Sequence, residues 1–252
     1  MAELLILGSG PGYPGGRRLP TTLAVKADGR LYLLDCGSPA ATLLARAGER
    51  IQDLEALFLT HMHVDHAGGV PLLLQALLVA ARERPLATLV PARSAERLRT
   101  AARAFLLEPE RYPFAWQLEE ANPYETYEFP GLTVSFLPNE HLRLLAGPEA
   151  PQSASLYLNV DGSTLLYSGD VAGPEELATH ARQCDLLVHE LGHHAPEAVL
   201  AFAARYGVPR LALVHIHPYW EGREKELFAL ARARYRGELI VPDDGTRIPL
   251  SE

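Results

Sequence analysis

Residues 60–69 read THMHVDHAGG and place three histidines and one aspartate within six positions. This cluster lies between two apolar runs, LEALFLT before it and VPLLLQALLVAARE after it. A solvated polar loop with surface histidines is the ordinary alternative. Three of only ten histidines in six residues, directly after a strand-like apolar run, favour a metal site instead.

Imidazole and carboxylate side chains together suit a divalent ion of borderline softness such as zinc. In an extended or turning loop, side chains at i and i+2 project to one side, so His61 and His63 can grip one ion. Asp65 and His66 can then turn toward another ion. Four ligands in one loop cannot all reach one ion together with residues from elsewhere, so the pattern favours two adjacent metals.

Further polar residues follow other apolar runs. His141 comes just after FLPNE, Asp170 ends LLYSGD, and His215 and His217 lie in LALVHIHP. Taken singly, such a histidine is more often a surface residue and such an aspartate a turn residue. The repeated arrangement at the ends of strands, where grafted sites tend to lie, makes them candidate ligands.

The apolar runs and turn residues predict an α/β chain forming one domain over residues 1–252. We expect strands at 3–8, 21–27, 31–36, 54–60, 87–92, 132–138, 153–160, 163–170, 185–190, 210–217, 238–242 and 246–250. We expect helices at 40–47, 72–84, 95–105 with Ser94 as the cap, 175–182, 196–206 and 224–235. Residues 108–127 remain unassigned. Hairpins at the start of each half, then alternating helices and strands, predict two mixed sheets between helices.

Composition and charge limit the classes of binding partner that we expect. The chain has 252 residues, 48% of them apolar and 21% charged, and a net charge of −8. The negative charge gives no overall attraction to nucleic acid or to an anionic membrane, although a local basic patch remains open. No apolar segment is long enough to span a bilayer, and MAELLILGSGPG has no secretion-signal pattern. With only two cysteines, we expect a cytoplasmic protein without a disulfide framework.

The motif HMHVDH, followed in order by His141, SGD and VHIHP, resembles the metallo-β-lactamase superfamily over nearly the whole chain. The segments LGSGPGYP, LLDCG and CDLLVHELGHH are similar to the ribonuclease Z branch, whose members mature tRNA 3′ ends. The resemblance implies a four-layer αββα sandwich with two metals in a cleft at one edge of the sheets.

The resemblance also implies a ligand set, with two Zn²⁺ per chain and Mn²⁺ or Fe²⁺ as alternatives. The implied ligands are His61, His63 and His141 for the first ion, Asp65, His66 and His215 for the second, and Asp170 bridging both. His215 is preferred to His217 because it directly follows LALV. Asp35 resembles an aspartate that orients the metal loop by hydrogen bonding, with a plain turn residue as the alternative.

Two metals would supply a bridging hydroxide near neutral pH, and Asp65 could accept a proton from the water. By resemblance, Glu190 and His193 match a pair that protonates the leaving 3′ oxygen. The alternative is that this pair only caps the next helix or braces its loop.

The chain departs from ribonuclease Z in one main respect. Only 28 residues, 142–169, separate His141 from Asp170, and they include two strands, so no flexible basic arm fits. We therefore expect a ribonuclease Z-like phosphodiesterase acting on a small phosphodiester, with RNA open but not favoured. Hydrolysis of a carboxylic ester, lactone or thioester, or a non-hydrolytic accessory role, are the alternatives. No membrane partner is expected, and a homodimer is left open.

Overall fold

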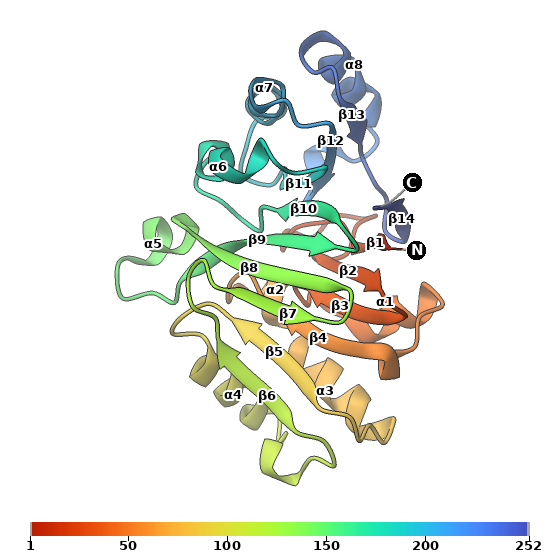
Figure 1. The fold of residues 1–252 in the computed structure, drawn as a ribbon, viewed down its shortest axis with the longest axis vertical. Helices are drawn as coiled ribbons and strands as arrows, with labels where there is room; N and C mark the ends of the chain where they lie inside the picture. Colours follow the sequence, from red (N-terminus) through yellow and green to blue (C-terminus); the bar gives the residue numbers. More distant parts are fainter. Residues whose placement is uncertain (1, 251–252) are drawn as a thin grey trace.

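The structure is a computed structural model that describes residues 2–250, and two seven-stranded sheets form its centre (Figure 1). The first sheet has the order β14-β1-β2-β3-β4-β5-β6. Its strands are β1 (Glu3–Gly8), β2 (Thr22–Ala27), β3 (Arg30–Leu34), β4 (Leu54–Phe58), β5 (Leu86–Val90), β6 (Trp116–Glu120) and β14 (Thr246–Pro249). The strands from β14 to β3 pair antiparallel, and those from β3 to β6 pair parallel.

The second sheet repeats this plan in the order β13-β12-β11-β10-β9-β8-β7. Its strands are β7 (Thr126–Phe129), β8 (Leu132–Asn139), β9 (Ser153–Val160), β10 (Ser163–Tyr167), β11 (Leu186–Glu190), β12 (Arg210–Val214) and β13 (Glu238–Ile240). The strands from β7 to β10 pair antiparallel, and those from β10 to β13 pair parallel. The predicted mixed sheets are confirmed.

Helices cover the outer face of each sheet. Those on the first sheet are α1 (Ala40–Arg46), α3 (Val70–Val79) and α4 (Ala95–Ala104), and those on the second are α6 (Ala178–Ala181), α7 (Pro196–Tyr206) and α8 (Glu224–Arg234). In Figure 1, α3 and α4 lie in the lower part of the view beside β5 and β6, and α6 to α8 lie in the upper part beside β11 to β13. The short α2 (Val64–Ala67) and α5 (His141–Ala146) carry candidate ligands. The fold is therefore the predicted αββα sandwich.

Successive side chains of each strand point to opposite faces of the sheet. They form three apolar cores, one between the two sheets and one between each sheet and its helices. On β1, Leu4 and Ile6 face the other sheet, whereas Leu5 and Leu7 pack toward the helices. Because both faces of these strands are buried, they form continuous apolar runs rather than an alternating pattern. This explains why the strands were recognisable in the sequence.

Several predicted boundaries are wrong, mostly where a strand runs into a polar loop. The strands predicted at 54–60, 163–170 and 210–217 end at Phe58, Tyr167 and Val214. The helix predicted at 72–84 is α3, which starts at Val70 and ends at Val79. The one predicted at 175–182 divides into a 3-10 turn, η3 (Pro174–Leu177), and α6.

Two further differences concern α4 and the unassigned segment. Ser94 precedes α4 as predicted, but its side chain makes no capping hydrogen bond; Glu120 accepts the N–H of Ala95 instead, at 3.1 Å. Residues 108–127 contain the 3-10 turn η2 (Pro109–Arg111), β6 and the start of β7. Within residues 2–250, no helix has the length and hydrophobicity needed to cross a membrane.

Candidate metal centre

The candidate ligands meet at one edge of the sandwich because each follows the end of a strand. Thr60 to His66 follow β4, with His63 preceding α2 and Asp65 and His66 within it. His141 follows β8, Asp170 follows β10, and His215 follows β12. Gly169, at φ +54°, allows the loop after β10 to pack closely against Thr60, because a Cβ at position 169 would lie only 2.8 Å from Cβ of Thr60.

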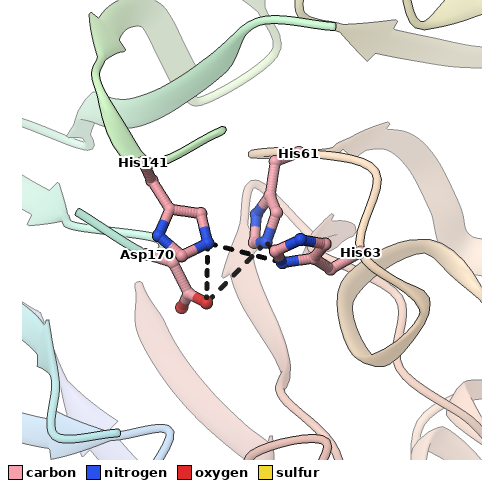
Figure 2. Close-up of side chains that lie close together, drawn as sticks. All are labelled: His61, His63, His141 and Asp170. Carbon is pink, nitrogen blue, oxygen red and sulfur yellow. Dashed lines mark hydrogen bonds and ion pairs between the residues drawn. The ribbon is translucent and has the colours of Figure 1, made fainter. Parts of the chain in front are cut away.

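The first group joins His61, His63, His141 and Asp170, whose ligand atoms lie within 4.8 Å of one another (Figure 2). Nδ1 of His63 lies 3.0 Å from Nε2 of His61 and 3.4 Å from Nε2 of His141. Oδ2 of Asp170 lies 3.7 Å from Nε2 of His61 and 3.6 Å from Nε2 of His141. Three imidazole nitrogens and one carboxylate oxygen thus lie close enough together to hold one divalent ion.

The second group joins Asp65, His66 and His215 beside the first. Nε2 of His215 lies 3.2 Å from Oδ2 of Asp65 and 3.6 Å from Oδ2 of Asp170. Nε2 of His66 lies 3.4 Å from Oδ1 of Asp170. The Asp170 carboxylate therefore faces both groups of side chains.

Buried hydrogen bonds fix the orientation of two of these rings. Asp35 is fully buried and accepts from the Thr60 N–H at 2.7 Å, from the Tyr167 hydroxyl at 2.7 Å and from Nδ1 of His66 at 2.8 Å. Oγ1 of Thr60 also lies 3.0 Å from Nδ1 of His61. Because each ring is held through Nδ1, its Nε2 is presented to the centre. The hydrogen-bonding role predicted for Asp35 is confirmed; the roles of Thr60 and Tyr167 were not predicted.

Two buried atoms at the centre, 3.4 Å apart, face each other without a well-formed hydrogen bond among the described residues. Nε2 of His66 and Oδ1 of Asp170 are buried and form no hydrogen bond. A buried polar atom without a hydrogen bond lowers the stability of the fold. A bound ion would satisfy both atoms. A divalent cation would coordinate both atoms, and the donor set of imidazoles and carboxylates suits it. The residues present therefore fit a metal.

Burial and neighbouring charges set the protonation states. Burial lowers the pKa of His141 to about 4, and burial with nearby His66 lowers the pKa of His61 well below its usual value. Both rings are therefore neutral at pH 7, the form that binds metal. Burial would raise the pKa of Asp170, but His66 and His215 outweigh it and lower that pKa well below its usual value. The candidate bridging group is thus a carboxylate.

Glu190, at the end of β11, organises the loop that follows it. Its Oε2 accepts the N–H groups of Gly192 at 2.8 Å and His193 at 2.9 Å. Its Oε1 lies 3.0 Å from Nδ1 of His193 and 3.2 Å from Nε2 of His194. The carboxylate raises the pKa of His193, whose side chain is 44% exposed and whose Nδ1 lies 3.8 Å from Oδ2 of Asp170. The pair braces its loop and also faces the centre.

His217 lies outside both groups. β12 ends at Val214, and the backbone turns at His215, where φ is +50°. His217 is exposed, and its Nδ1 accepts the N–H of Tyr219 at 3.1 Å. The two histidines of HIH consequently have different surroundings, although i and i+2 residues of a continuous strand would share one face.

Comparison with known proteins identifies the family. A sequence model of the family described as "Beta-lactamase superfamily domain" matches residues 30–216. The chain belongs to this superfamily. A protein named Ribonuclease Z from Pseudomonas putida is 29% identical, and the match covers 98% of this chain and 97% of the relative. Ribonuclease Z from Methanosarcina acetivorans is 26% identical, with 96% of each chain covered.

Solved structures share the superfamily fold. The metallo-beta-lactamase fold protein YhfI from Bacillus subtilis superposes with a TM-score of 0.80 at 19% identity, covering 98% of each chain. The short form of human tRNase Z gives 0.77 at 18% identity, covering 99% of this chain and 100% of the other. The family and its ribonuclease Z relatives identify this member as a metal-dependent hydrolase.

Proposed function

We propose that this chain is a binuclear zinc-dependent phosphodiesterase of the ribonuclease Z type. The observation that supports it is the position of Asp170, whose Oδ1 faces His66 and whose Oδ2 faces His61, His141 and His215. A carboxylate that lies close to ligands of both groups is suited to bridge two ions. Five imidazoles around two carboxylates favour zinc, with Mn²⁺ or Fe²⁺ as alternatives.

Each of the two groups of side chains would hold one ion. His61, His63 and His141 would hold one ion, Asp65, His66 and His215 the other, and Asp170 both. When bound, such ions supply a hydroxide nucleophile near neutral pH and stabilise the charge that develops on the phosphoryl oxygens.

Side chains of the protein would accept and donate the protons that the reaction transfers. The carboxylate of Asp65, positioned by the contact of its Oδ2 with Nε2 of His215 at 3.2 Å, would accept a proton from the attacking water. His193 would donate a proton to the leaving oxygen, because Glu190 holds its ring beside Asp170 and favours the protonated form. Glu190 itself is buried and would act by positioning His193.

The segment between His141 and Asp170 supports a small substrate. It consists of α5, a short connection and the β9–β10 hairpin. Both hairpin strands belong to the second sheet, and α5 has six residues, so no extended arm projects from this segment. We therefore propose a phosphodiester of nucleotide size rather than a folded RNA as the substrate.

Parallel assays of the zinc-loaded protein with bis-p-nitrophenyl phosphate and p-nitrophenyl acetate test this function. We expect turnover of the diester, and a loss of at least about 100-fold in Asp170→Asn, because the candidate bridging group loses its charge. Turnover of the acetate alone would indicate a carboxylic ester hydrolase. Turnover of neither substrate would favour a non-hydrolytic accessory protein.

A further inference from the structure

Two loops meet beside the metal centre: residues 9–19 after β1, and residues 215–223 after β12. The carbonyl of Ser9 accepts the N–H of Ile216 at 2.9 Å. Gly12 passes so close to the second group of ligands that a Cβ there would lie 2.9 Å from Oδ2 of Asp65. Tyr13, which follows Gly12, and His217, two places after His215, are therefore on the loops that border the centre.

Those two residues, Tyr13 and His217, form an aromatic stack. Their ring centroids are 5.7 Å apart and their planes differ by 23°. The His217 ring is fixed because its Nδ1 accepts the N–H of Tyr219 at the start of the 3-10 turn η4 (Pro218–Trp220). Tyr13 is 64% exposed, so its ring rests on a fixed plane and still offers area to a ligand.

Other contacts already hold the 9–19 loop in place. The carboxylate of Asp244 accepts the N–H of Ser9 at 2.9 Å and the N–H of Leu19 at 2.8 Å. Nη1 of the buried Arg18 donates to Oγ of Ser9 at 2.6 Å and to the carbonyl of Pro242. The loop does not need Tyr13 as an anchor, which favours a role for this ring in binding.

Charges around the stack argue against recognition of a chain of phosphates. Arg17 pairs with Glu224 at 3.4 Å and Asp243 at 3.3 Å. Arg223 pairs with Glu226 at 2.6 Å and lies over the Tyr219 ring at 4.0 Å. Because acidic partners already balance these cations, the surface around the stack is better suited to a flat, uncharged group.

We propose that the Tyr13–His217 stack is a nucleobase subsite and that the substrate is accordingly a nucleoside phosphodiester. This inference rests on the proposed phosphodiesterase function, since the metal centre would hold the phosphodiester while the base stacks on Tyr13. Every nucleobase has a π-face, so such a platform tolerates different bases.

Two substrates with one leaving group test the subsite: thymidine 5′-(p-nitrophenyl phosphate) and methyl p-nitrophenyl phosphate. We expect the wild-type protein to prefer the thymidine ester in kcat/KM. Tyr13→Leu should lower that preference about 10-fold, mainly through KM, because base–aromatic stacking contributes about 5-fold to 150-fold in affinity. Tyr13→Phe, which keeps the ring, should retain it. Phe105→Leu is the matched control, because Phe105 is 69% exposed and belongs to neither loop.

Binding of thymidine 5′-monophosphate, measured by calorimetry on the zinc-loaded protein, gives a readout without turnover. Tyr13→Leu should weaken it about 10-fold relative to Phe105→Leu. His217→Asn removes the supporting plane but keeps an acceptor for the Tyr219 N–H, so it should also weaken binding while zinc content stays unchanged.

Three outcomes would overturn the inference. Hydrolysis of both esters with the same preference in wild type and Tyr13→Leu would overturn the subsite alone. Loss of zinc in His217→Asn would make that residue a metal ligand rather than part of a stacking platform. Hydrolysis of neither ester would overturn the proposed function and this inference with it.

Discussion

At the scale of single residues, the structure separates His193 from its neighbour His194. Both contact Glu190, but Nε2 of His194 also turns to the carbonyl of Val171 at 3.1 Å, whereas His193 faces Asp170. His193→Asn should slow cleavage of a dinucleoside phosphate by about 10²- to 10⁴-fold, because its leaving alkoxide needs a proton. Hydrolysis of bis-p-nitrophenyl phosphate should fall by less than about 10-fold, since p-nitrophenolate leaves unprotonated.

The leaving-group dependence distinguishes proton donation from loop bracing, and the control is His194→Asn. That variant removes a comparable contact with Glu190 and should change the two rates by the same factor. Equal loss on both substrates in His193→Asn would contradict the proton-donor role and leave His193 with the bracing role alone.

Asp35 gives a second prediction at this scale. Its carboxylate is the hydrogen-bond partner of Nδ1 of His66, so Asp35→Asn should weaken zinc binding about 10- to 100-fold. Competition with a chromophoric chelator measures the affinity, and circular dichroism verifies the fold. Tyr167→Phe, which removes one hydrogen bond to the same carboxylate, should have a smaller effect. Unchanged zinc affinity in Asp35→Asn would contradict the orienting role.

At the scale of elements, the strands buried on both faces and the edge strands β13 and β14 could be predicted, whereas the edge strands β6 and β7 could not. β6 and β7 lie at the edges of their sheets, and most of their residues are partly or fully exposed. Without a continuous apolar run or a clear alternation, residues 108–127 gave no strand signal. The ends of the central strands were overextended because the polar site residues follow the apolar runs directly.

The candidate site could be predicted more fully than the loops around it, from the positions of polar residues after apolar runs together with the family resemblance. The residues of HMHVDH, with His141, Asp170 and His215, were predicted to converge, and the structure brings them together. The stack of Tyr13 on His217 was not predicted, because it depends on the turn at His215, where φ is +50°. A non-glycine residue in this conformation leaves no mark in a sequence.

The end of α3 gives a prediction about stability. Arg82, 1% exposed, donates to the carbonyls of Arg84, Leu54 and Pro85 at 2.7 Å each. Arg82→Met would remove these three hydrogen bonds, including the buried one to the Leu54 carbonyl, and should lower the free energy of unfolding by about 2–4 kcal/mol. Arg84→Met, at a half-exposed side chain paired with Glu55, should change it by less than about 1 kcal/mol. Urea unfolding of both variants measures the difference; equal values would contradict this account.

At the scale of the whole molecule, the net charge of −8 and the short segment after His141 favour a small substrate over tRNA. The arginine-rich α4 offers few free positive charges that could bind RNA in place of a basic arm. Arg99 donates to the carbonyl of Leu118 at 3.0 Å, and Arg103 pairs with Glu110 at 2.8 Å. Much of the affinity for RNA comes from phosphate neutralisation, so precursor tRNA should be cleaved poorly even at low ionic strength. Accurate 3′ cleavage at physiological salt would contradict this prediction.

The central claim is that two ions act together across Asp170, and a zinc titration tests it most directly. Chelator-stripped protein would receive increments of zinc while bound metal and turnover of bis-p-nitrophenyl phosphate are followed together. Because both groups of ligands face the one carboxylate, turnover should rise until two equivalents are bound and then level off. Full turnover at one bound equivalent, with no further change at two, would contradict the binuclear centre.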